Sequence, residues 1–107
     1  MNKHKEYVRY LTNHEYITMT IYGRAMSKTY KQLNENLRQI HLLNEKIANK
    51  RPGDGECYLY NAQMLKILGV ERRMLKETRD KISRNMDFIV KRAQRRMCDI
   101  RLLNCDD

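Results

Sequence analysis

The side chains best suited to chemistry are cations, which gather in two stretches of the second half of the chain. Lys and Arg account for 22 of the 107 residues and Asp and Glu for 13, so the net charge is +9 at pH 7. Such a surplus is typical of proteins that bind nucleic acid, an anionic membrane or an acidic protein, although a solvated basic face without a partner is the plain alternative. The candidate partner-binding residues are Arg72, Arg73, Arg79, Lys91, Arg92, Arg95 and Arg96.

The spacing of three of these arginines predicts a shared surface. Arg92, Arg95 and Arg96 are three and four residues apart, so on a helix they form a ridge. Phosphates would bind such a ridge with an affinity that falls steeply as salt rises, and carboxylates would bind it through paired guanidinium hydrogen bonds. The sequence has no zinc-ligand spacing, no aromatic RNA-binding strand and no clear helix-turn-helix, so it does not separate the two partners.

Other reactive residue types lack the patterns that catalysis needs. His4, His14 and His41 have no second His or Cys at ligand spacing, and the PGDG sequence at 52–55 lacks the frame of a phosphate-binding loop. Cys57 follows this sequence near a possible helix N-terminus, which can lower a thiol pKa, but an ordinary half-buried thiol is the simpler interpretation. We expect no enzyme activity, no metal, no cofactor and no small-molecule substrate.

The cysteines and the N-terminus indicate a compartment. Cys57, Cys98 and Cys105 are odd in number and form no C-x-x-C pair, which favours a reducing environment over a disulfide framework. The first ten residues, MNKHKEYVRY, are followed by no apolar signal region. No run approaches the roughly 18 apolar residues of a membrane span. We therefore expect a cytoplasmic protein that does not bind membranes.

A long helical pattern must position the first half of the chain. Met19, Met26, Leu33, Ile40 and Ile47 recur every seven residues, which is close to the seam of a coiled coil. Further apolar residues that accompany this stripe are Tyr22, Tyr30, Leu37 and Leu43. The pattern predicts a helix over about 15–49, with Thr12 or Asn13 as its N-cap.

A sharp reversal follows this helix. Pro52 cannot donate a backbone hydrogen bond and disfavours helix at Arg51. Gly53 and Gly55 adopt positive φ at low cost, and Asp54 can bond within its own turn. The sequence predicts a turn at 51–56 and antiparallel helices on either side of it.

The second half of the chain allows two arrangements. The apolar pattern thins between Gly69 and Asp80, which favours helices at about 57–75 and 78–103 over one continuous helix at 57–103. A continuous helix would leave its second half without a partner unless the protein dimerised. We therefore favour an all-α fold, an elongated antiparallel three-helix bundle of the spectrin or coiled-coil type, with residues 1–107 as a single domain.

Three stretches of the sequence carry a resemblance to a known family: EKIANKRPGDGECYLYNAQ at 45–63, ILGVERRML at 67–75 and ITMTIYGRAMSKTY at 17–30. They resemble tubulin-binding cofactor A, a family of small cytosolic three-helix bundles. Lys76 stands where the family usually has a proline. The resemblance implies a non-catalytic, chaperone-like protein that binds β-tubulin. Two alternatives remain: a basic RNA- or ribosome-binding factor, and a coiled-coil subunit of a larger assembly. A monomer and a homodimer are both open.

Overall fold

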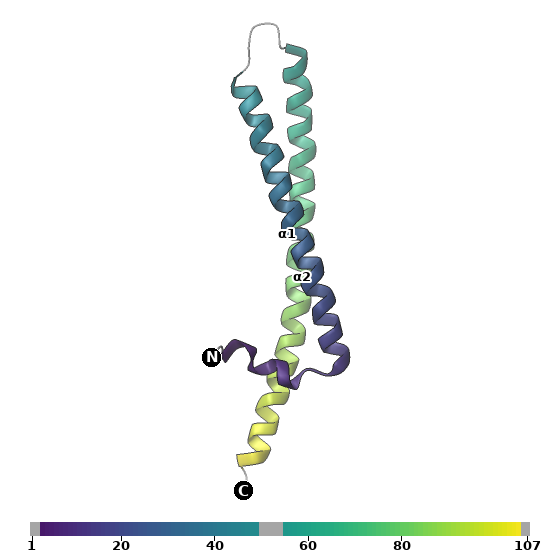
Figure 1. Cartoon of the computed structure of the whole chain (residues 1–107), viewed down its shortest axis with the longest axis vertical. Coiled ribbons are helices and arrows are strands. Elements are labelled where there is room, and N and C mark those ends of the chain that lie inside the picture. Colours follow the sequence, from purple (N-terminus) through teal and green to yellow (C-terminus); the bar gives the residue numbers. More distant parts are fainter. Residues whose placement is uncertain (1–2, 50–54, 106–107) are drawn as a thin grey trace. The chain divides into compact units, whose positions relative to one another are not determined.

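The protein is helical throughout the part of the chain that its computed structural model describes, residues 3–49 and 55–105. A 3₁₀ helix, η1, covers Lys3–Tyr10, and two long α-helices follow, α1 over Asn13–Ala48 and α2 over Gly55–Cys105 (Figure 1). The predicted all-α class is confirmed. Of the turn predicted at 51–56, residues 51–54 lie outside the described residues, whereas Gly55 and Glu56 already belong to α2.

The second half of the chain is one helix, so the break favoured between residues 75 and 78 was wrong. The three-helix bundle is not supported, and the continuous alternative is the one observed. No proline interrupts the 51 residues of α2, and Lys76 continues the helix at the position where a proline would have ended it. Most residues around Lys76 are good helix formers, which outweighs the cost of roughly 1 kcal/mol for Gly69.

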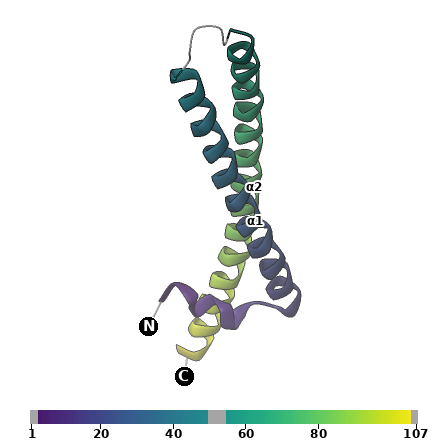
Figure 2. The ribbon, with the colours of Figure 1, turned by 45° about the horizontal axis from the view of Figure 1, so that its top comes forward.

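The chain divides into two units. Unit 1 contains Met1–Met26 and Lys81–Asp107, and unit 2 contains Ser27–Asp80. Within each unit, a segment of α1 runs antiparallel to a segment of α2 (Figures 1 and 2). Unit 1 also contains η1, so each unit has its own helix pair and its own interior.

The predicted stripe of α1 is largely confirmed, with two exceptions. Tyr30 and Leu37 are 49% and 38% exposed, and polar residues, Thr29 and Asn36, are buried in their place. The term seam is used here for positions three and four residues apart that are buried or half-buried along a helix. The seam of α1 consists of Glu15, Met19, Tyr22, Met26, Thr29, Leu33, Asn36, Ile40, Leu43 and Ile47.

The seam of α2 continues through the stretch where the apolar pattern thins. Arg72 and Arg79 are half-buried at seam positions on either side of Leu75. A long arginine stem can lie along apolar surface while its guanidinium group reaches polar atoms, so these cations replace apolar residues without ending the seam. The seam of α2 consists of Asn61, Leu65, Leu68, Arg72, Leu75, Arg79, Ile82, Met86, Ile89, Ala93 and Arg96.

Unit 2 is held by apolar contacts and one buried amide. Leu33 and Leu68 are 6% and 4% exposed, and Asn36 is 1% exposed. Nδ2 of Asn36 donates to the carbonyl oxygen of Leu68 at 2.9 Å, and Nη1 of Arg72 donates to the carbonyl oxygen of Leu33 at 3.5 Å. Oδ1 of Asn36 has no hydrogen-bond partner among the described residues. A buried amide at such a position lowers stability but fixes the alignment of two helices, which is the role that we assign to Asn36.

Neither α1 nor α2 contains, within the described residues, a stretch long and apolar enough to cross a membrane.

Candidate partner-binding surface

The start of α1 is fixed by a capping box. The backbone N–H of Glu15 donates to Oγ1 of Thr12 at 3.1 Å, and the backbone N–H of Thr12 donates to Oε1 of Glu15 at 3.0 Å. Each side chain therefore satisfies a backbone donor that the first turn of the helix leaves free. Of the two predicted caps, Thr12 is the one used.

The same carboxylate binds an arginine of α2. Glu15 is 7% exposed, and Nη2 of Arg96 lies 2.6 Å from both of its oxygens. Arg96 also donates through Nη1 to the carbonyl oxygen of Tyr10, and Nε of Arg92 lies 4.0 Å from Oε2 of Glu15. The hydrogen bonds from Arg96 and then from the Thr12 N–H lower the pKa of Glu15, and burial opposes them. Glu15 is therefore an ionised link between helices and is poorly suited to accept a proton in catalysis.

These contacts also attach η1 to α2. Besides the Arg96 bond to the Tyr10 carbonyl, Nη2 of Arg101 lies 2.8 Å from Oε2 of Glu6. The Arg101 pair is exposed on both sides, so it contributes less than the half-buried contact of Arg96. The N-terminal segment is thus attached to α2 within unit 1, mainly through Arg96.

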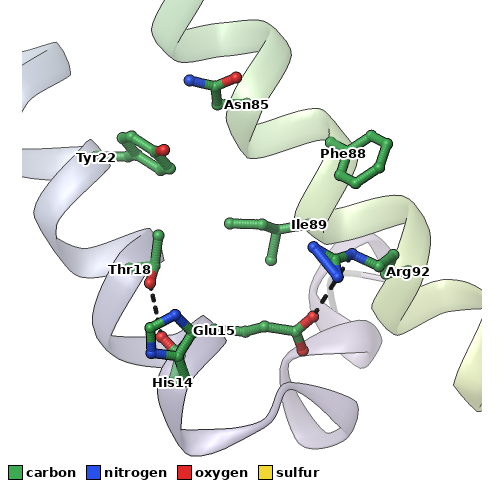
Figure 3. Close-up of a pocket in the computed structure, with 8 residues that line it drawn as sticks. All are labelled: His14, Glu15, Thr18, Tyr22, Asn85, Phe88, Ile89 and Arg92. Carbon is green, nitrogen blue, oxygen red and sulfur yellow. Dashed lines mark hydrogen bonds and ion pairs between the residues drawn. The ribbon is translucent and has the colours of Figure 1, made fainter.

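A pocket opens beside the Glu15 link. Its volume is about 230 Å³, and Figure 3 shows the side chains that line it. Thr18 donates to the carbonyl oxygen of His14 at 2.8 Å, which leaves the hydroxyl proton engaged within α1. Phe88 is 63% exposed, and the guanidinium carbon of Arg92 lies 5.0 Å from the centre of its ring. The lining residues are His14, Glu15, Thr18, Tyr22, Asn85, Phe88, Ile89 and Arg92.

A band of cations lies on the side of α2 opposite its seam. Its members are three and four residues apart, so they share one side of the helix, and all are exposed. We call this band the outer basic face; it consists of Lys81, Arg84, Phe88, Lys91 and Arg95. Its four cations make no ion pair with any carboxylate in residues 3–49 and 55–105. The arrangement presents free positive charge around one exposed ring.

The structure separates the predicted site residues into two groups. Three are half-buried at the seam of α2: Arg72 and Arg96 contact carbonyl oxygens of other segments, and Arg79 lies 3.2 Å from its neighbour Asp80. The exposed predicted residues are Arg73, Lys91, Arg92 and Arg95. The predicted ridge is divided, because Arg92 and Arg96 turn toward Glu15 whereas Arg95 belongs to the outer basic face.

Three residues of the outer basic face were not among the predicted ones. Lys81, Arg84 and Phe88 have the right spacing to join Lys91 and Arg95. Finding them requires knowing which side of α2 is its seam. The sequence does not show which side is the seam, because arginines occupy three of the seam positions.

No matching family or relative suggests a function, so the functional proposal rests on the surface residues. Comparison of the chain with protein-family models, with curated proteins and with solved structures finds no match. Within the described part of the chain, no three His, Cys, Asp or Glu side chains gather in a way suited to a metal ion.

Proposed function

We propose that this chain is a cytoplasmic, non-catalytic binding protein that holds an acidic protein surface against the outer basic face of α2. The observation that carries the proposal is the set of four cations around Phe88 that pair with no carboxylate in the described part of the chain. The resemblance to tubulin-binding cofactor A supplies the first partner to test, β-tubulin.

The composition of this surface suits a protein partner. Opposite charges steer two proteins toward each other and raise the association rate, with an effect that salt reduces. Aromatic and arginine side chains also dominate the binding energy of many interfaces. Phe88 and Arg92 provide such a pair beside the pocket, where a side chain of the partner would find room (Figure 3).

Charge reversal on the outer basic face tests the proposal. We expect Lys91→Glu with Arg95→Glu to weaken the capture of unpolymerised tubulin at least tenfold, equivalent to about 1.4 kcal/mol. The matched control is Lys28→Glu with Lys31→Glu, which changes the net charge equally at two exposed positions of α1 in unit 2. Capture that falls equally in both variants would indicate a non-specific charge effect and contradict the assignment of the surface.

RNA is the second candidate, because an exposed aromatic ring among cations is also how single strands are bound. Bases stack on such rings at about 1–3 kcal/mol each. If RNA is the partner, a filter-binding titration gives a steep decline of log affinity with log salt, and Phe88→Leu weakens binding without reducing that slope. A flat salt response, or binding unchanged by Phe88→Leu, removes this candidate.

A further inference from the structure

The outward side of α2 in unit 2 carries an apolar stripe that no other described element covers. Tyr60, Ile67, Val70 and Met74 are 63%, 57%, 47% and 61% exposed. Their spacings of seven, three and four residues place them on one side of the helix, opposite the seam that contains Leu68. We call these four residues the apolar stripe.

In the part that the structure describes, unit 2 buries fewer apolar side chains than the stripe exposes. Among its described side chains, Leu33 and Leu68 are the buried apolar ones. A helix pair with so little buried apolar surface is marginally stable, and an exposed apolar stripe commonly marks a contact with another protein. A partner for the stripe would therefore supply stability that unit 2 lacks.

The residues that flank the stripe differ in charge from one side to the other. Leu59, Lys66 and Arg73 follow one edge, and Met64, Glu71 and Thr78 follow the other. When two identical helices pack in parallel through such a stripe, each residue of one edge lies opposite the residue five positions later on the other edge of the second copy. Lys66 then lies opposite Glu71 of the second copy, and Leu59 opposite Met64 of the second copy.

The antiparallel arrangement brings like edges together. Lys66 would lie near Arg73 of the second copy, and like charges at that distance repel. The flanking charges thus select one orientation. The contact from residue 59 to residue 78 covers nearly three heptads, roughly 30 Å of helix.

We propose that the apolar stripe is a homodimer interface, in which α2 of a second copy of this chain packs in parallel along residues 59–78. Gln63 lies within the stripe, between Tyr60 and Ile67, and Glu77 follows Met74 on the same side of the helix. The stripe belongs to unit 2 and the outer basic face to unit 1. Lys81 follows Met74 by seven residues in the same helical pattern, and like charges of two copies would repel there, so the proposed contact ends at residue 78.

The oligomeric state of the full chain tests the interface. Sedimentation equilibrium is expected to give a dimer for the natural chain and a monomer for Ile67→Glu, with unchanged helix content because Ile67 is exposed. Ile21→Glu is the matched control, since Ile21 is 59% exposed on α1 in unit 1. A natural chain that stays monomeric at about 100 μM, or a dimer that survives Ile67→Glu, overturns the proposal. A monomer whose capture of tubulin is abolished by Ile67→Glu also overturns it and assigns the stripe to tubulin.

A charge exchange tests the orientation. Lys66→Glu and Glu71→Lys are each expected to raise the dimer dissociation constant about fivefold, and the double variant is expected to return it to within about twofold of the natural value. Tighter dimerisation by Lys66→Glu alone would indicate pairing with Arg73 and overturn the parallel arrangement. Failure of the double variant to recover would likewise contradict the pairing of Lys66 with Glu71.

Discussion

Replacing Glu15 is expected to weaken unit 1 in two separable steps. Glu15→Gln removes the negative charge that Arg96 binds, yet a glutamine at this position can still complete a capping box. Glu15→Ala removes both contacts. The two variants therefore distinguish the ion pair from the cap at a single position.

The geometry sets the size of each step. A hydrogen bond to a charged group contributes about 1.5–3 kcal/mol, and the lower end applies because the Arg96 side chain is 35% exposed and partly hydrated. The cap contributes about 1 kcal/mol. We expect Glu15→Gln to lower the free energy of unfolding by about 1.5–2 kcal/mol and Glu15→Ala by about 3 kcal/mol. These are large fractions of the stability of a small protein.

Urea unfolding followed by circular dichroism at 222 nm measures both variants. Glu35→Ala is the control, because Glu35 also contacts an arginine, Arg38 at 2.5 Å, but both side chains are more than half exposed. Its unfolding midpoint should match that of the natural chain. Equal midpoints for Glu15→Gln and the natural chain would refute the assigned role of the Arg96 contact.

The contact between Glu15 and Arg96 makes the free energy of unfolding depend on pH in the acidic range. The carboxyl of Glu15 takes up a proton near its ordinary pKa of 4.5 in the unfolded chain and at a lower pH in the folded one. Its contribution is therefore complete above pH 4.5 and is lost as the pH falls through the folded pKa. Below pH 4.5 we expect the natural chain to lose stability more steeply than Glu15→Gln. Parallel pH profiles would contradict this reasoning.

Five further variants test three other features, each by urea unfolding. Gly69→Ala and Gly23→Ala should each stabilise the chain by about 0.5–1 kcal/mol, because an added Cβ meets nothing within 4 Å at either position; a loss of stability would indicate an undetected close contact. Asn36→Leu should raise the free energy of unfolding by removing a buried oxygen that has no partner among the described residues, whereas Asn36→Asp should lower this free energy by several kcal/mol; the reverse order would contradict our account of the seam. Leu33→Ala should cost about 2–5 kcal/mol because Leu33 is buried, and a cost below 1 kcal/mol would show that the unit 2 interior lies elsewhere.

Much of α1 could be predicted from sequence because its signals are local. Thr12 followed three residues later by Glu15 is a capping pattern, and methionine, leucine and isoleucine repeat every seven residues from Met19 onward. The predicted range of 15–49 agrees with Asn13–Ala48 to within two residues.

The continuity of α2 was harder to predict because arginine hides its role. If arginine is counted as a polar residue, the apolar pattern is interrupted at Arg72 and Arg79. In the structure both side chains are half-buried, and their aliphatic stems occupy seam positions. The apolar pattern does not predict Asn36 as a buried residue, because asparagine also counts as polar. It places Tyr30 on the stripe because Tyr30 is large and apolar, although Tyr30 is exposed. The bond between Glu15 and Arg96 joins residues 81 positions apart, so no local pattern could reveal it.

The order in which the contacts can form follows from their separation along the chain. The hydrogen bonds of unit 2 join residues 32 and 39 positions apart, whereas those that attach Tyr10 and Glu6 to α2 span 86 and 95 positions. Unit 2 can therefore complete its contacts before the N-terminal segment is attached to Arg96 and Arg101, and until then that segment is exposed to chaperones and proteases.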